Sequence, residues 1–334
     1  MIPCCFHPTR VILIDDDHEF FDNLHNSLSS DHASYQYFNN PEAAIHYLNE
    51  VYKPNPFPNR YIEAIDEDKW EHRRLDVNVW DTHHEVYRPE RFEEISVVVV
   101  DHSMGDVTGI EVCRQITDPN IQKILLTGMT DQEIAIRAFN EGVIHHYIRK
   151  QDPDMAAQLN QAIESAQWRY FNKLSEVTLK AITSDDLVNP AIVDPNFQNF
   201  FKELVKQHGF SEAYLCEAMG SYVFVTEDGT SHGLVVNNAD QLEVSSESAE
   251  ALNVDATLLE DLKNRKKMMA YHSRHGTFEP PAEEWQNHVY SPQILQGKRE
   301  NYYYVFTPNL FDIDLSRVLP FGDYKAGRMV EIKY

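Results

Sequence analysis

Several polar side chains in this sequence stand directly after short apolar runs. The stretches are RVILIDDD (residues 10–17), SVVVVD (96–101), KILLT (123–127) and HHYIRK (145–150). Clustered carboxylates repel one another, so such a group takes up a proton or holds a cation, and a hard ion such as Mg²⁺ suits carboxylate oxygens. A lysine and a threonine hydroxyl stabilise charge on a phosphoryl group, and a carboxylate can itself be a nucleophile. If the ends of these runs meet, they support phosphoryl transfer.

The elements that would bring these residues together are the strands of a parallel sheet. The run Val97–Val100 has no polar alternation, which is typical of a strand buried on both faces. Residues 20–28, 110–116 and 134–139 lie between the runs and have helical spacing. This alternation predicts a doubly wound parallel α/β domain over residues 1–150, in which the carboxyl ends of the strands share one edge. An aspartate at the end of a single strand is more often a helix cap or a turn residue. The prediction of a functional site therefore depends on finding suitable polar residues at several strand ends.

These strand ends resemble the receiver domain of two-component response regulators. The residues that carry the resemblance are the acidic pair Asp15 and Asp16, Asp101 with the loop DHSMGDVTG, Thr127, and YIRK with Tyr147 and Lys150. The resemblance implies a flavodoxin-like, CheY-like domain, in which a doubly wound parallel sheet of five strands is flanked by helices.

The resemblance also implies roles for individual residues. Asp101 would be the phosphoacceptor, and Thr127 and Lys150 would contact the phosphoryl group. The implied cofactor is Mg²⁺, bound by Asp15, Asp16, Asp101 and the backbone carbonyl of Ser103. The implied partner is a sensor histidine kinase or a phosphotransfer protein. The domain itself would catalyse both the phosphoryl transfer and the later dephosphorylation.

Two loops depart from the family pattern, which has proline after the lysine and after the methionine of the acceptor loop. Here Gln151 follows Lys150, and Gly105 follows Met104. Neither change removes a group that the chemistry needs, so we expect looser loops around an intact site.

The domain organisation departs further from an ordinary receiver. We predict a receiver domain over residues 1–152 with an insertion at 54–94, a long helix or linker over 153–182, and an α+β output domain over 183–334. The insertion opens with prolines and carries the aromatic residues Tyr61, Trp70, Trp80 and Tyr87. Aromatic residues argue against disorder, so an ordered flap, a partner-binding surface and a tolerated loop all stay open. This arrangement is similar to the quorum-sensing response regulators of Legionella.

After Pro153, residues 154–182 contain neither glycine nor proline, and their apolar residues recur every three or four positions, as in a coiled coil or a bundle helix. These residues are Leu159, Ile163, Ala166, Tyr170, Leu174, Val177 and Ala181. We expect phosphorylation to favour a homodimer held by residues 130–141, 146–149 and the start of this helix, together with the seam around Tyr170, Leu174 and Val177. In the alternative, the seam packs on the output domain of the same chain.

The output region shows an α+β pattern. We expect a helix over 197–208 stopped by Gly209 and three antiparallel strands within residues 212–238, joined at Gly220-Ser221 and by a hairpin turn at Asp228-Gly229. A helix over 255–271 and a late strand in NYYYVFTP should follow. The sequence of this region contains no glycine-rich phosphate loop and no nucleophile elbow, which favours an output domain that acts through interactions. The alternative is an enzymatic or nucleotide-binding output domain that the receiver controls. Metal binding by His272, His275 and His288 is disfavoured, because no cysteine or carboxylate completes the set.

Composition limits the classes of partner. The 334 residues carry a formal net charge of -24, which discourages direct DNA binding. The apolar runs are too short to cross a membrane, and no signal peptide opens the sequence, so we expect a cytoplasmic protein. The 4 cysteines are too few for a disulfide scaffold, and we interpret all of them as thiols.

Overall fold

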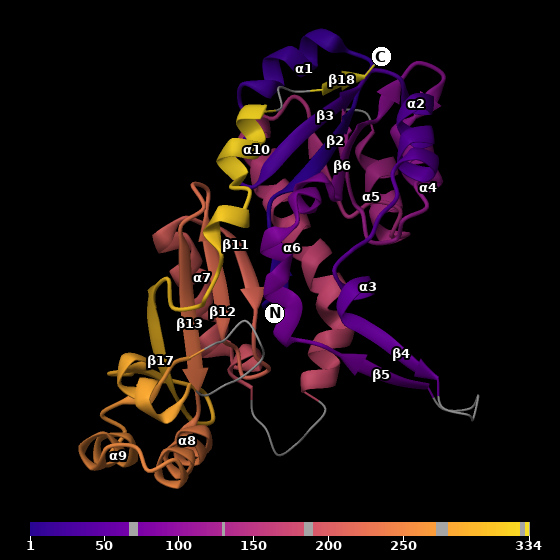
Figure 1. Cartoon of the computed structure of the whole chain (residues 1–334). Helices are drawn as coiled ribbons and strands as arrows, with labels where there is room; N and C mark the ends of the chain where they lie inside the picture. The colour runs from indigo at the N-terminus through magenta and orange to yellow at the C-terminus, as the bar shows by residue number, and fades with distance from the viewer. Residues whose placement is uncertain (67–72, 129–130, 184–189, 272–279, 328–330, 334) are drawn as a thin grey trace. The chain divides into compact units, whose positions relative to one another are not determined.

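The computed structural model describes residues 1–66, 73–128, 131–183, 190–271, 280–327 and 331–333 (Figure 1). The chain forms two compact units, each built from separate stretches of sequence. The parallel-sheet unit comprises Phe6–Arg60, Pro89–Ser175 and Phe321–Tyr334. The antiparallel-sheet unit comprises Met1–Cys5, Tyr61–Arg88 and Glu176–Pro320. No helix in the described part of the chain has both the length and the apolar character needed to cross a membrane.

The predicted five-stranded parallel sheet is confirmed, in the order β3-β2-β6-β9-β10. Its strands are β2 (Thr9–Ile14), β3 (Ala33–Phe38), β6 (Ile95–Asp101), β9 (Gln122–Thr127) and β10 (His146–Arg149). A sixth strand, β18 (Glu331–Lys333), comes from the C-terminal end of the chain and pairs in parallel with β3. Every residue of β2 and β6 is buried, which explains the unbroken apolar runs Val11–Ile14 and Val97–Val100 within them.

Alternate residues of each central strand face two different hydrophobic clusters. Ile12 and Val98 belong to one cluster, which also contains residues of α2 (Pro41–His46), α4 (Gly109–Gln115) and α5 (Gln132–Asn140). Val11 and Val97 belong to the other, which contains residues of α1 (His18–His25) and of the first half of α6 (Met155–Ile182). Because neighbouring side chains of a strand point to opposite faces, the helices cover both sides of the sheet. The 28-residue helix α6 confirms the long helix predicted over 153–182.

The C-terminal segment completes the parallel-sheet unit through α10 (Phe321–Gly327) as well as through β18. The Tyr324 hydroxyl lies 3.2 Å from Arg10 Nη2, and the Phe321 ring lies 5.1 Å from the Phe92 ring. Arg10 also donates to Glu93, over 2.6 Å. The predicted linear boundaries at 152 and 182 stay predictions, because the compact units follow contacts between distant stretches of the chain.

The antiparallel-sheet unit contains the sheet β1-β11-β12-β13-β17-β16. The strands are β1 (Cys5–Phe6), β11 (Phe210–Leu215), β12 (Tyr222–Thr226), β13 (Ser231–Asn237), β16 (Gln293–Gln296) and β17 (Asn301–Pro308). The expected antiparallel strands and the late strand in NYYYVFTP are present. Helix α7 (Pro195–His208) ends at Gly209, whose φ of 64° suits a residue without a Cβ.

Two helices of this unit differ from the expectation. The helix predicted over 255–271 is wrong beyond α9 (Ala256–Lys263), because the backbone at Arg265 turns to a φ of 56°. Met268–Met269 instead form β14, which pairs with β15 (Val289–Tyr290). Helix α8 (Ala239–Ala251) was not predicted, since Leu242 is the one large apolar side chain that it buries among the described residues. His272 and His275 lie outside the described residues.

The insertion predicted at 54–94 is structured over its described part. It contains α3 (Pro58–Tyr61), the antiparallel pair β4 (Ile62–Asp66) and β5 (Arg73–Val77), and the 3-10 turns η2 (Trp80–Tyr87) and η3 (Pro89–Glu93). Trp70 lies outside the described residues. Most of the insertion belongs to the antiparallel-sheet unit, and the chain then returns through η3 to β6. All four cysteines are buried and are thiols rather than members of a disulfide, as predicted.

Candidate functional site

The carboxyl ends of β2, β6, β9 and β10 place the predicted site residues on one edge of the parallel sheet. Asp101 and Thr127 are the last residues of β6 and β9. Asp15 and Lys150 directly follow β2 and β10. The register aligns Asp101 with Leu126, and Arg149 with Thr127. Parallel pairing alone therefore brings together side chains that are far apart in the sequence.

Three carboxylates gather at this edge. Asp15, Asp16 and Asp101 each offer an oxygen, and these oxygens all lie within 4.8 Å of one another. Asp15 and Asp101 are buried, whereas Asp16 is exposed. Burial raises the pKa of Asp15, although the hydrogen bond from Lys150 opposes the shift. A carboxylate set this close, with one member open to solvent, fits a hard divalent cation such as Mg²⁺.

Lys150 joins two of these carboxylates. Its Nζ lies 2.8 Å from Asp15 Oδ2 and 3.0 Å from Asp101 Oδ1. Burial lowers the pKa of Lys150, but the hydrogen bonds to Asp15 and Asp101 outweigh burial and raise it. The same Nζ lies 4.1 Å from the centre of the Phe20 ring, so an aromatic face shields the ammonium. The ammonium is therefore held in its charged form beside Asp101.

Thr127 and Ser103 reach the edge differently. Thr127 is fully buried, and its hydroxyl donates to the carbonyl of Ile148 over 3.4 Å. Ser103 is exposed in the loop after β6, and its backbone N–H donates to Asp101 Oδ2 over 3.3 Å. Tyr147 is half-buried on β10 and packs against the hydrophobic cluster under α4 and α5. The sheet thus collects all the residues predicted for the site.

The loop after Asp101 explains one departure from the family pattern. Ser103–Met104 and Val107–Thr108 form a small antiparallel pair around Gly105. Gly105 has a φ of 55°, which proline cannot adopt because its ring holds φ near about −65°. Gly105 therefore allows a backbone conformation in this loop that a proline at the same position would not allow.

Sequence reasoning did not single out Gly109, Phe20 or Tyr37. A Cβ on Gly109 would lie 2.1 Å from the carbonyl oxygen of Asp101, so a larger residue cannot pack there without displacing the end of β6. Tyr37 on β3 donates a hydrogen bond to the carbonyl of Asp15. Gly109 ends the quoted motif DHSMGDVTG, but its role depends on a contact across the loop that sequence alone does not reveal.

Comparisons with known proteins agree with this geometry. A family model for the response regulator receiver domain matches residues 67–164. The response regulator LqsR of Legionella pneumophila is similar in structure, with a TM-score of 0.79 and 30% sequence identity over 97% of this chain and 95% of that chain. A receiver domain protein of Clostridium thermocellum is 20% identical over 48% of this chain and 94% of its own length, with a TM-score of 0.32. A search of curated proteins finds no match.

Proposed function

Because this chain belongs to the family of response regulators, we propose that Asp101 is its phosphoacceptor and that phosphorylation switches the interactions of the protein. The observation that carries the proposal is the position of Lys150 Nζ, 2.8 Å from Asp15 and 3.0 Å from Asp101. Phosphoryl transfer needs an acceptor, a positive charge that stabilises the phosphoryl group and ligands for a cation. Asp101, Lys150 and the pair of Asp15 and Asp16 are of the right kind for these three roles. The donor would be a sensor histidine kinase or a phosphotransfer protein.

In the transfer, a carboxylate oxygen of Asp101 forms a bond to phosphorus while the phosphorus–nitrogen bond of the donor phosphohistidine breaks. The electron pair of that bond returns to the imidazole. Lys150 keeps its contact with Asp15 and moves its second contact from Asp101 to a phosphoryl oxygen. Thr127 turns its hydroxyl from Ile148 toward another phosphoryl oxygen. Mg²⁺, bound by Asp15, Asp16, Asp101 and the Ser103 carbonyl, would neutralise charge on the phosphoryl group.

We infer that phosphorylation favours a homodimer through the exposed face of α5. Ile134, Ile136 and Phe139 are 50%, 41% and 47% exposed, an unusual density of large apolar side chains for one short helix. Residue 130, at the start of the predicted face, lies outside the described residues. In the predicted seam of α6, Tyr170 and Leu174 are buried within the chain and Val177 is 45% exposed. The α5 face therefore supports the dimer better than that seam does.

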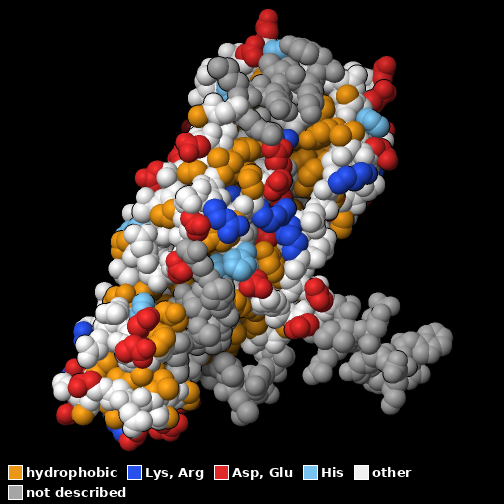
Figure 2. Space-filling view, in the orientation of Figure 1, with side chains coloured by type: hydrophobic (Ala, Val, Ile, Leu, Met, Phe, Trp, Pro, Cys, Tyr) orange, Lys and Arg blue, Asp and Glu red, His pale blue; other side chains and the backbone are white. Residues whose placement is uncertain are grey.

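Charge argues for a protein partner rather than DNA as the target of the output region. On the face that Figure 2 shows, Lys and Arg side chains of the described residues lie in small groups among acidic and uncharged ones. A duplex needs a continuous basic surface, and the whole chain carries a net charge of -24. We propose that the output region acts through protein contacts.

The test of the acceptor is phosphorylation by acetyl phosphate with Mg²⁺, followed by mass spectrometry of the intact protein. Asp101→Asn should remove the added phosphoryl group, because an amide cannot form the acyl phosphate. Asp106→Asn is the matched control, since Asp106 is an exposed carboxylate in the same loop. Unchanged modification of Asp101→Asn would contradict the assignment.

A further inference from the structure

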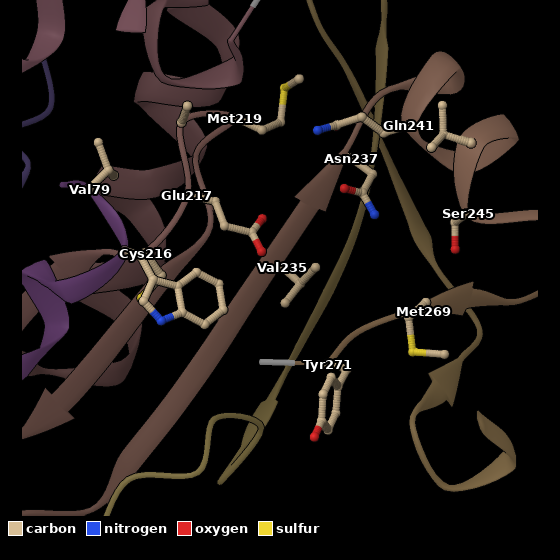
Figure 3. Close-up of a pocket in the computed structure, with 13 residues that line it drawn as sticks. Val79, Cys216, Glu217, Met219, Val235, Asn237, Gln241, Ser245, Met269 and Tyr271 are labelled. Atoms are coloured by element: carbon tan, nitrogen blue, oxygen red, sulfur yellow. The ribbon is translucent and has the colours of Figure 1, made fainter. Parts of the chain in front are cut away.

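A pocket of about 400 Å³ lies in the antiparallel-sheet unit. Figure 3 shows Glu217 extending into it from the turn after β11, with Asn237 at the end of β13 and Met269 and Tyr271 around the cavity. Val235, Met219 and Met269 are buried and supply apolar surface. This volume is in the range of small-molecule sites, and apolar walls with a few polar groups are typical of them.

The polar groups of the pocket are incompletely paired within the described part of the chain. Glu217 Oε2 accepts from Ser221 Oγ over 2.9 Å, and its other carboxylate oxygen accepts no hydrogen bond from the described residues. Ser245 Oγ is buried, lines the same pocket and has no hydrogen-bond partner among the described residues. Burial raises the pKa of Glu217 to about 7, although the hydrogen bond from Ser221 opposes the shift. A buried polar group without a partner costs free energy, so a ligand that supplies one is favoured.

The charge of the pocket excludes one class of ligand. Among the described residues that line the pocket, Glu217 is the carboxylate, and none is a lysine, arginine or histidine. The phosphate oxygens of a nucleotide would meet no cationic side chain among these described lining residues. A ligand with a positive charge would instead pair with Glu217, and Trp80 and Tyr271 supply aromatic surface of the kind that attracts cations.

We propose that this pocket binds a small organic amine, with its ammonium group at the Glu217 carboxylate and its apolar body against Met219, Val235 and Met269. Ser245 and Asn237 are placed to accept or donate further hydrogen bonds. The insertion contributes Val79 and Trp80 to the wall, and the chain runs on from η2 through η3 into β6. Trp80 of the insertion thus takes part in the proposed binding site.

The experiment compares three probes of similar size and different charge: 2-phenylethylamine, 2-phenylethanol and phenylacetate. Binding to the full chain is measured by isothermal titration calorimetry at about pH 8, where the amine is protonated and Glu217 ionised. The amine should bind at least about tenfold more tightly than the alcohol, and the acid should bind most weakly. Equal affinities of amine and alcohol, or no binding of the amine, would overturn the proposal.

A pair of variants separates the pocket from the overall charge of the chain. Glu217→Gln keeps the size of the side chain and removes its charge, so the preference for the amine over the alcohol should disappear. Glu243→Gln removes an exposed carboxylate on α8 and should keep the preference. An undiminished preference in Glu217→Gln would place the amine elsewhere. The comparison of probes on the unchanged protein decides the proposal even if a variant fails to fold.

Discussion

Lys150 Nζ lies 2.8 Å from Asp15 Oδ2 and 3.0 Å from Asp101 Oδ1, and so links two carboxylates that belong to the ends of different strands. Asp15 is 135 residues away from Lys150 along the chain. The ammonium compensates part of the repulsion among the three carboxylates. Asp16 is exposed and is not among the carboxylates that Lys150 contacts. Its carboxylate is therefore available to bind a further cation.

Mg²⁺ should therefore raise the melting temperature of the protein by binding its folded state. The stabilisation is about 2.7 kcal/mol when Mg²⁺ is present at about 100 times its dissociation constant. Asp16→Ala should abolish the rise, because it removes the exposed carboxylate of the group. Differential scanning calorimetry with Mg²⁺ and with EDTA measures the effect, and Asp106→Ala is the control. A full rise in Asp16→Ala would place the cation at another site.

Gly109→Ala should disturb Asp101 through the backbone. The added Cβ would lie 2.1 Å from the Asp101 carbonyl oxygen, and relieving that contact should cost roughly 1–3 kcal/mol of unfolding free energy. The displaced carboxylate should also accept phosphate roughly 100-fold more slowly. Urea unfolding and the rate of phosphorylation by acetyl phosphate measure the two effects. Gly327→Ala, where an added Cβ meets no atom within 4 Å, should leave both nearly unchanged.

Phe139→Glu should weaken the proposed dimer. The substitution places a charge among the exposed apolar side chains of α5, and burying an unpaired charge at an interface is costly. We expect the unmodified chain to show a larger mass with acetyl phosphate in multi-angle light scattering, and the variant to stay monomeric. Val51→Glu alters a comparably exposed apolar residue, at 54%, outside α5 and should still dimerise. Dimerisation of Phe139→Glu would exclude this face.

The stability of the antiparallel-sheet unit should fall as the pH rises through the pKa of Glu217. Burial raises this pKa to about 7 from its ordinary value of 4.5, so the neutral form is favoured in the folded state. The resulting stabilisation is fully present below about pH 4.5 and is lost toward and above pH 7, with a magnitude of at most about 3 kcal/mol. Among the described residues that line the pocket, the other ionisable groups are Cys216 and Tyr271.

Urea unfolding at several pH values measures this dependence. Glu217→Gln cannot ionise and should have a flatter profile between about pH 5 and pH 7.5 than the unchanged chain. Glu243→Gln, with its exposed side chain, should keep the original slope. If Glu217→Gln kept that slope, another group would be responsible.

The sequence by itself determined the parts of this protein that depend on neighbouring residues. Unbroken apolar runs located the central strands, and the polar residues after them located Asp15, Asp101, Thr127 and Lys150. The absence of glycine and proline indicated α6, and Gly209 marked the end of α7. These features were predictable because burial on both faces, helix periodicity and helix termination each depend on residues that are close together in the sequence.

Only the tertiary structure decided which distant stretches come together. The pairing of β18 with β3, the ion pairs of Lys150 and the packing of Gly109 against Asp101 join residues whose local patterns carry no information about one another. Likewise, the insertion supplies Trp80 to a pocket whose carboxylate, Glu217, follows β11. Such contacts depend on the balance between burial and chain entropy over the whole fold, so a short window of sequence cannot specify them.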